Sequence, residues 1–357
     1  MSFGHRKAKV VVAMSGGVDS SVTAGILLAS GYDVEGVSLR LWEGGRAEPR
    51  NCSDHRGAAD IAAQLGILHT LIDARSSFAQ TVVRSFVTDY VEGRTPNPCV
   101  ACNRDFKLGV LLEWARARGA DYVATGHYAR LRRDPASGRA SLARGADRNK
   151  DQSYFLFALS QEQLARTLFP LGDLEKTEVR AVARRLRLPV AERPESQDVC
   201  FGDYKAFVES LADPADLCGG EIVDRSGKIL GRHDGVHRMT IGQRKGLGVS
   251  SAQPLYVLEI DNATKQVIVG GKEELRCRGL VAHSLNWIEP PENGEISAEV
   301  QVRYRSPSIP CRVRVHGDGT CEAHFEESFP SVTPGQAAVF YDGDRVLGGG
   351  WIERSLG

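Results

Sequence analysis

Hydrophobic positions follow two different spacings along this chain. In the first half, short apolar runs at residues 9–14, 33–39, 68–72 and 121–125 alternate with segments of helical spacing, such as residues 20–31. Helical spacing also covers residues 54–66, 77–93, 107–119, 160–169 and 176–188. This alternation predicts an α/β domain, in which helices cover both faces of a parallel sheet.

The second half has a spacing of two, interrupted by turn residues. Hairpins are expected at residues 220–232, 255–271, 311–325 and 337–354, with a further strand in residues 297–306. The C-terminal part is therefore predicted to be mostly β-structure.

Composition and charge narrow the class of protein. The 357 residues are 42% hydrophobic and 25% charged, which is typical of a globular protein of two or three domains. Lys and Arg balance Asp and Glu at 45 each, so the net charge indicates no polyanionic partner. No apolar run is long enough for a signal peptide or a membrane span, and eight cysteines without such a signal favour a reducing compartment. We expect a cytoplasmic protein with no membrane partner.

The clearest chemical pattern is "AMSGGVDSS" at residues 13–21, where the first strand meets the first helix. Two glycines allow a tight turn and a close approach to a ligand, and the amides of the helix start can bind phosphate oxygens. The pattern is not a Walker A loop, because no lysine follows the glycines. It resembles the pyrophosphatase loop of the N-type ATP pyrophosphatases, which adenylate a carbonyl oxygen and let a nucleophile displace AMP.

A second pattern, "TPNPCVACNR" at residues 95–104, places two cysteines three positions apart. This spacing serves zinc, iron-sulfur and thiol chemistry alike, so by itself it leaves all three open.

Other segments indicate which molecule carries the carbonyl oxygen that is adenylated. They are "ATGHYAR" (124–130), "KDQSYFL" (150–156), "ESQDVCF" (195–201), "TIGQRKGLG" (240–248), "RYRS" (303–306) and "TPGQAAVFYDGDRVLGGG" (333–350). With the first two patterns, they closely resemble the bacterial tRNA-specific 2-thiouridylases (MnmA/TrmU family) over nearly the whole chain. The resemblance implies a PP-loop ATP pyrophosphatase domain at residues 1–209, a small β-rich central domain at 210–276 and a C-terminal β-barrel at 277–357.

The same resemblance implies ATP-dependent 2-thiolation of the wobble uridine of tRNA, with ATP and Mg²⁺ as cofactors. Adenylation makes AMP the leaving group at C2, since the oxygen alone cannot leave. Asp19 is expected to take part in catalysis. The nucleotide-binding residues implied are Ala13, Met14, Ser15, Gly16, Gly17, Val18, Asp19, Ser20, Leu39 and Gly126.

Two cysteines match the family's sulfur chemistry. Cys200 corresponds to the carrier of the persulfide and Cys102 to the other catalytic cysteine, and the persulfide comes from a relay protein or a cysteine desulfurase. Because a thiolate is required, both are expected to have a lowered pKa and partial access to solvent. Many family members carry Asp where this chain has Cys99, so Cys99, Cys102 and Cys200 are also possible ligands of an iron-sulfur cluster. Both mechanisms stay open.

A tRNA substrate agrees with three locally basic segments, at residues 126–152, 228–245 and 303–314. By resemblance, the tRNA contacts fall at His127, Lys150, Asp151, Gln152, Arg303, Tyr304 and Gln336. The glycine-containing segment 240–248 is expected to be a loop over the site. Two other classes remain: an amide-forming ligase on the same adenylating fold, and a non-catalytic RNA-binding protein with a metal knuckle.

Overall fold

The computed structural model describes residues 7–42, 54–194, 200 and 202–357. The chain divides into two compact units. The first contains Met1–Gln80, Cys99–Gly202 and Asp344–Val346, and the second contains Thr81–Pro98, Asp203–Gly343 and Leu347–Gly357.

A parallel sheet forms the centre of the first unit. Its strands, in spatial order, are β3 (Leu68–Asp73), β2 (Asp33–Arg40), β1 (Lys9–Ala13), β4 (Tyr122–Ala124) and β7 (Thr167–Leu168). All neighbours pair in parallel. Val10, Val11 and Val12 have no exposed surface, as expected for a central strand buried on both faces. The predicted α/β domain is confirmed.

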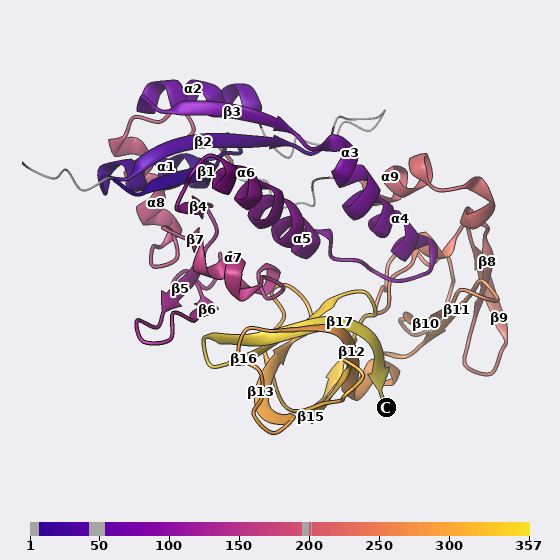
Figure 1. Ribbon diagram of the computed structural model, residues 1–357. Helices are drawn as coiled ribbons and strands as arrows, with labels where there is room; N and C mark the ends of the chain where they lie inside the picture. Colours follow the sequence, from indigo (N-terminus) through magenta and orange to yellow (C-terminus); the bar gives the residue numbers. More distant parts are fainter. Residues whose placement is uncertain (1–6, 43–53, 195–199, 201) are drawn as a thin grey trace, which may run out of the picture. The chain divides into compact units, whose positions relative to one another are not determined.

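Helices cover this sheet. Helices α1 (Val18–Ala29), α2 (His55–Leu65) and α8 (Lys176–Arg185) share one apolar core with β1, and Figure 1 shows α2 lying along β2 and β3. Helix α6 (Leu111–Ala117) packs against β4. The other described helical segments before residue 200 are α3 (Arg75–Phe78), η1 (Ala79–Val83), α4 (Arg84–Val91), α5 (Pro98–Ala101), η2 (Cys102–Val110), η3 (Ser153–Phe155) and α7 (Gln161–Ala165), of which α4 and residues 81–83 of η1 belong to the second unit. Among the described helices, none has both the length and the apolar run needed to cross a membrane.

Two features of the first unit differ from the sequence-based expectation. The helix expected over 160–169 ends at Ala165, because residues 167 and 168 pair with β4 as strand β7. A hairpin of β5 (Ala129–Arg133) and β6 (Ala140–Arg144) lies within the basic segment, where no strands were predicted.

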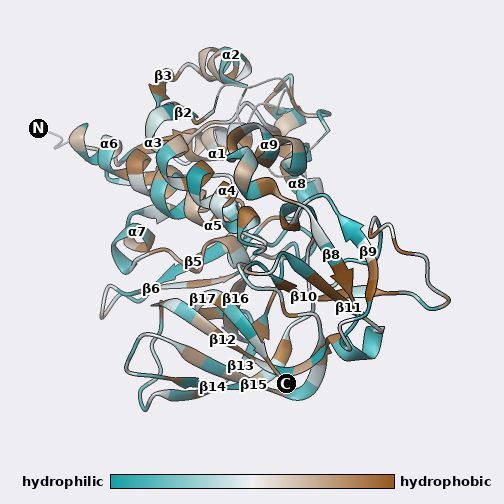
Figure 2. Cartoon of the chain, turned by 90° about the vertical axis from the view of Figure 1, so that its right-hand side faces the viewer, coloured by the Kyte–Doolittle hydropathy of each residue, from teal (hydrophilic) through white to brown (hydrophobic). Residues whose placement is uncertain are grey.

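A small sheet lies in the second unit. Its strands, in spatial order, are β10 (Tyr256–Asp261), β11 (Gln266–Gly270), β8 (Gly220–Val223) and β9 (Ile229–His233), and Figure 2 shows β10 and β11 as largely apolar. Helix α9 (Tyr204–Leu211) packs on α4, where Tyr204 stacks on Tyr90 at 4.6 Å between ring centres. The short helices of this unit are η4 (Pro214–Leu217), η5 (Val236–Arg238) and η6 (Lys272–Leu275).

The C-terminal strands form a closed barrel. Their spatial order is β12 (Arg276–Trp287), β15 (Cys321–Pro330), β14 (Ile309–Val315), β13 (Glu295–Gln301), β16 (Ala337–Asp342) and β17 (Arg345–Leu356), and β12 also pairs with β17. Figure 1 shows the resulting ring of strands, and inward residues such as Leu280, Val313 and Phe340 have no exposed surface. The hairpins and the barrel predicted for this half are confirmed.

Candidate active site

The glycine loop, residues 14–20, connects β1 to α1 at the carboxyl end of the parallel sheet. Gly16 has a φ of +76°, and a Cβ there would lie 2.5 Å from the carbonyl oxygen of Asp54, so only glycine fits. The Ser15 amide donates to Ser20 Oγ at 3.1 Å, and Ser20 Oγ donates to the carbonyl oxygen of Gly17 at 3.1 Å. No side chain of the described residues caps the first turn of α1, so the amides of this turn can bind an anion.

A cavity of about 230 Å³ opens beside the glycine loop. Its lining residues come from the loop, the end of β2, helix η2 and the segments after β4 and before η3. They are Ala13, Met14, Ser15, Asp19, Ser20, Val37, Leu39, Leu41, Lys107, Thr125, Gly126, His127 and Gln152. Most of the residues expected to bind the nucleotide therefore meet in one place. Gly16 and Gly17 lie in the loop itself, whereas Val18 is 3% exposed and packs into the core.

Asp19 is held by two side chains that the sequence did not single out. Lys176 Nζ, at the start of α8, lies 2.6 Å from Asp19 Oδ1, and the hydroxyl of Tyr128 donates to the same oxygen at 2.8 Å. Tyr128 lies within the quoted segment 124–130 but was given no role, and Lys176 lies outside every quoted motif. The missing lysine of the glycine loop was the one signal that a cation must come from elsewhere in the chain.

His127 lies in the cavity as a neutral imidazole. Burial, helped by the positive charge of Lys107, lowers the pKa of His127 to about 3. Its Nδ1 is 2.7 Å from Thr125 Oγ1, and its ring packs edge-on against Phe169. A neutral imidazole can donate or accept one hydrogen bond at its other nitrogen.

The cysteine pair lies on α5 and η2, with Cys102 as the first residue of η2. Helix η2 is a π-helix, whose i→i+5 bonding places Lys107 one turn after Cys102. Burial raises the pKa of Cys102 to about 11 and that of Cys99 to about 12, and the charge of Lys107 opposes both shifts. Repulsion from Cys200 also raises the pKa of both cysteines.

The pKa of Cys102 and the grouping of the three cysteines differ from the sequence-based expectations. The expected lowered pKa of Cys102 is wrong, because the loss of hydration exceeds the effect of Lys107. Cys102 is buried, whereas Cys99 and Cys200 are partly exposed, and none of the described cysteines forms a disulfide. Within the described ranges, no three His, Cys, Asp or Glu side chains are grouped to hold a metal ion, so the three cysteines do not fit as a ligand set here.

The residues expected to contact tRNA fall in both units. In the first unit, Gln152 lines the cavity, and its Oε1 accepts from the Tyr128 amide at 3.1 Å. Lys150 lies in the turn before it, and the Asp151 carboxylate faces inward, accepting from the Gly145 amide at 2.9 Å and from Ser153 Oγ at 2.9 Å.

In the second unit, the side chain of Gln336 donates to the carbonyl oxygen of Thr95 at 2.8 Å, just before the cysteine pair in sequence. Arg303 donates to the carbonyl oxygen of Ser331, and the neighbouring Arg305 lies 5.2 Å from the ring centre of Tyr304.

The basic segment 126–152 is less free than its composition suggests. Arg130 and Arg148 both pair with Asp344, and Arg132 pairs with Asp173. Part of the positive charge of this segment is therefore used within the protein.

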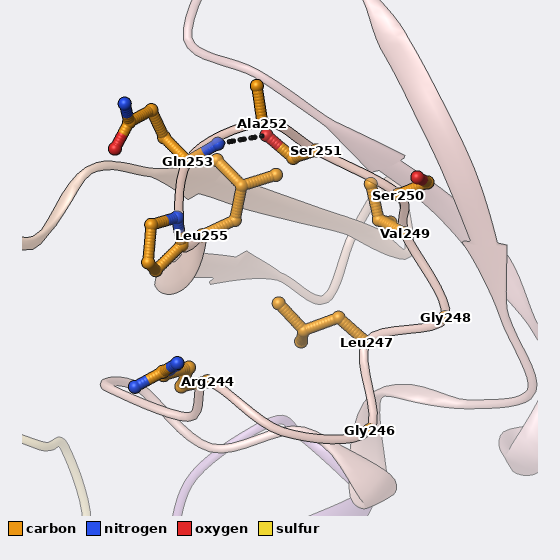
Figure 3. Close-up of a pocket in the computed structure, with 11 residues that line it drawn as sticks. Arg244, Gly246, Leu247, Gly248, Val249, Ser250, Ser251, Ala252, Gln253 and Leu255 are labelled. Carbon is orange, nitrogen blue, oxygen red and sulfur yellow. Dashed lines mark hydrogen bonds between the residues drawn. The ribbon is translucent and has the colours of Figure 1, made fainter.

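The glycine-containing segment expected over the site forms one wall of a second hollow. Residues 244 and 246–255 line a hollow of about 570 Å³. Figure 3 shows Leu247 and Leu255 pointing into this space, and the backbone amide of Gln253 donates to Ser251 Oγ at 3.3 Å. Leu247 and Val257 belong to the apolar core of the small sheet, so packing against this sheet holds the segment in place.

Comparison with known proteins gives matches along nearly the whole chain. Residues 8–203 match the family described as "tRNA methyl transferase HUP domain", residues 205–271 the "tRNA methyl transferase PRC-barrel domain" and residues 277–352 the "Aminomethyltransferase beta-barrel domain". The tRNA-specific 2-thiouridylase MnmA of Geotalea uraniireducens is 50% identical, covering 99% of this chain and 96% of the relative. The protein of the same name from a Picosynechococcus species is 49% identical, covering 97% and 98%.

Solved structures resemble this chain only loosely. The U34-tRNA thiolase NcsA from Methanococcus maripaludis with its [4Fe-4S] cluster aligns with a TM-score of 0.34 and 17% identity, covering 57% of this chain and 64% of that one. A likeness this weak carries over none of that protein's chemistry.

Proposed function

The chain belongs to the family of the tRNA-specific 2-thiouridylases, and from this we propose that it replaces the C2 oxygen of the wobble uridine of tRNA with sulfur, at the expense of ATP. The observation that carries the proposal is the cavity in which the glycine loop meets Gly126, His127 and Lys107, with Cys102 one helical turn away. Adenylation and sulfur transfer need this proximity, because adenylation of the C2 oxygen activates the carbon that the sulfur then attacks.

The nucleotide half of the cavity performs adenylation in this proposal. The amides at the start of α1 bind the phosphates, Leu39 and Gly126 bound the space for the nucleotide, and the C2 oxygen attacks the α-phosphate to release pyrophosphate. Asp19 is the carboxylate suited to Mg²⁺, because its Oδ2 accepts no hydrogen bond from the described residues while Oδ1 accepts two. A single carboxylate together with phosphate oxygens is the usual way in which proteins hold Mg²⁺ beside a nucleotide, and the ion neutralises the leaving pyrophosphate.

Sulfur transfer follows at the thiol side of the cavity. The terminal sulfur of a persulfide on Cys200 attacks C2, and AMP leaves with the former C2 oxygen. The Cys102 thiolate then attacks Cys200 Sγ, the sulfur-sulfur bond breaks, and its electrons stay on the sulfur now bound to C2. The resulting Cys102–Cys200 disulfide is reduced by a thiol reductant before the next turnover. Lys107 favours the thiolate that this step needs.

The cluster-dependent alternative has less support. Cys99, Cys102 and Cys200 influence one another electrostatically, yet they are not grouped as metal ligands in the described structure, and burial raises the pKa of Cys99 to about 12. A thiolate ligand set would require all three to lose their protons. We therefore derive no step through a cluster. Iron and acid-labile sulfide in protein purified without oxygen, lost in Cys99→Ala together with activity, would establish the alternative.

The tRNA side of the proposal extends over both halves of the chain. We assign uridine contacts to His127 and Gln152, whose side chains line the cavity. Further contacts to tRNA are assigned to Lys150, Asp151, Arg303, Tyr304 and Gln336. We also propose three domains, at residues 1–209, 210–276 and 277–357, a persulfide-donating partner protein, and a cytoplasmic location alongside the tRNA substrate.

The test is direct. Purified protein, unmodified tRNA, ATP and a persulfide donor are incubated, and 2-thiouridine and AMP are quantified by mass spectrometry. We expect one AMP per 2-thiouridine with the wild type, and no 2-thiouridine with Cys102→Ser or Cys200→Ser. Full turnover of both variants would favour the amide-forming ligase, and absence of any adenylation with tRNA would favour a non-catalytic RNA-binding protein.

A further inference from the structure

The glycine loop carries a negative charge and has no nearby cation in sequence. Asp19 is part of the loop, and residues 10–39 contain no Lys or Arg. A triphosphate brings several more negative charges to the same place. The binding of ATP therefore requires positive charge from another part of the chain, beyond what helix amides supply.

Lys176 is positioned to supply this charge. It is the first residue of α8, is only 8% exposed, and its Nζ lies 2.6 Å from Asp19 Oδ1. Its own amide donates to Asp147 Oδ2 at 3.0 Å, which fixes the start of the helix. A buried lysine is unfavourable unless it is paired, so this placement is a specific feature of the site and not a chance surface contact.

Two other cations near the loop are engaged differently. Lys107 also lines the cavity, but its charge acts on Cys102 and His127, which places it toward the thiol side. Arg193 donates to the carbonyl oxygen of Gly16 and pairs with Asp54, and neither Arg193 nor Asp54 lines the cavity.

We propose that Lys176 binds the β- and γ-phosphates of ATP and so replaces the lysine that the glycine loop lacks. Asp19 lines the cavity, so the ammonium group lies directly behind the cavity wall, within hydrogen-bonding distance of a residue that a bound triphosphate would meet. The Tyr128 hydroxyl bonds to the same Asp19 oxygen at 2.8 Å and holds the carboxylate when Lys176 turns to the phosphates. The positive charge then stabilises pyrophosphate as it leaves. This inference rests on the ATP-dependent reaction proposed above and names the residue that holds its leaving group.

The experiment compares ATP with AMP, which lacks the two phosphates in question. Binding of each nucleotide to the full chain, with Mg²⁺ and without tRNA, is measured by calorimetry for the wild type, Lys176→Met and Lys176→Gln. We expect ATP affinity to fall by about ten- to hundredfold in both variants, as for the loss of a charge-assisted hydrogen bond, with AMP affinity unchanged. AMP binding also reports whether each variant has folded. Gln keeps a donor for Asp19, so it separates loss of charge from loss of that bond.

Lys9→Met is the matched control. Lys9 pairs with Glu35 at 3.1 Å in the same unit and does not line the cavity, so this variant should bind ATP as the wild type does. Equal losses of ATP and AMP affinity in the Lys176 variants, or no loss at all, would overturn the proposal.

A double substitution separates phosphate binding from a role through Asp19. If Lys176 contacts the phosphates, Lys176→Met weakens ATP binding in an Asp19→Asn background as well. If Lys176 only orients Asp19, the second substitution has no further effect, and the proposal is wrong. Because no tRNA is present, a chain that binds ATP in this way but thiolates no tRNA would contradict the proposed function and leave this inference standing.

Discussion

Substitution of Gly126 by alanine tests how closely the two walls of the nucleotide cavity approach each other. A Cβ at this position would lie 2.9 Å from the carbonyl carbon of Asp19 and 2.9 Å from the amide nitrogen of Ser20. Both atoms belong to the backbone of the first turn of α1, which cannot move aside as a flexible side chain can. Gly126→Ala must therefore push the glycine loop away from the end of β4. Overpacking of this kind costs about 1–3 kcal/mol, and we expect ATP affinity to fall by about five- to hundredfold.

The assay is calorimetric titration of ATP, with the thermal unfolding midpoint measured in parallel. Gly317→Ala is the control, because no atom lies within 4 Å of a Cβ at Gly317 and the exchange itself is expected to be harmless there. If the Gly126→Ala variant binds ATP as tightly as the wild type, the reasoning is refuted, since the loop could then move from β4 without consequence for the nucleotide.

Three further predictions concern charge inside the first unit. Lys107→Met should raise the pKa of Cys102 further and slow its alkylation at pH 9 by up to about tenfold, measured by mass spectrometry, because each pKa unit is a tenfold change in thiolate; equal rates would contradict the assigned effect of Lys107. The pKa of His127 is about 3 when folded and about 6.5 when unfolded, so its contribution to stability is lost as pH falls below about 6.5. In urea unfolding, His127→Gln should remove about 2 kcal/mol of that loss between pH 7 and pH 5, and an unchanged pH dependence would show a charged or exposed ring. Asp151→Ala should lower the free energy of unfolding by about 3 kcal/mol, since it removes a buried carboxylate that accepts hydrogen bonds from the Gly145 amide and Ser153 Oγ and pairs with Arg144, and a urea midpoint equal to that of the wild type would contradict this.

Much of the fold could be predicted because its signals are local. The apolar runs of β1 and β2 and the turn residues of the C-terminal hairpins report their own structure. Strand β7 could not be found this way, because residues 167 and 168 are a strand only through pairing with β4. The β5–β6 hairpin could not be predicted for a related reason: three of the five residues of Ala129–Arg133 are arginine, on both faces of the strand, so little apolar alternation remains.

In the candidate site, too, features with a local sequence signal could be predicted and features that depend on long-range contacts could not. The glycine loop is local in sequence, whereas the Lys176–Asp19 pair joins residues 157 positions apart and no spacing rule can detect it. The pKa of Cys102 was predicted with the wrong sign, because a motif shows which residue is nucleophilic in a family but not how deeply this chain buries it. Lys107 was missed as well, since its relation to Cys102 depends on the π-helical winding of η2.

In the proposed reaction, the oxygen lost from uridine leaves on AMP. The most direct measurement uses tRNA transcribed with a heavy oxygen isotope at the uridine C2 position, incubated with the protein, ATP and a persulfide donor. We predict one heavy oxygen in the phosphate of AMP for every 2-thiouridine formed. Formation of 2-thiouridine with unlabelled AMP, or with the heavy oxygen in water, would contradict adenylation of the C2 oxygen.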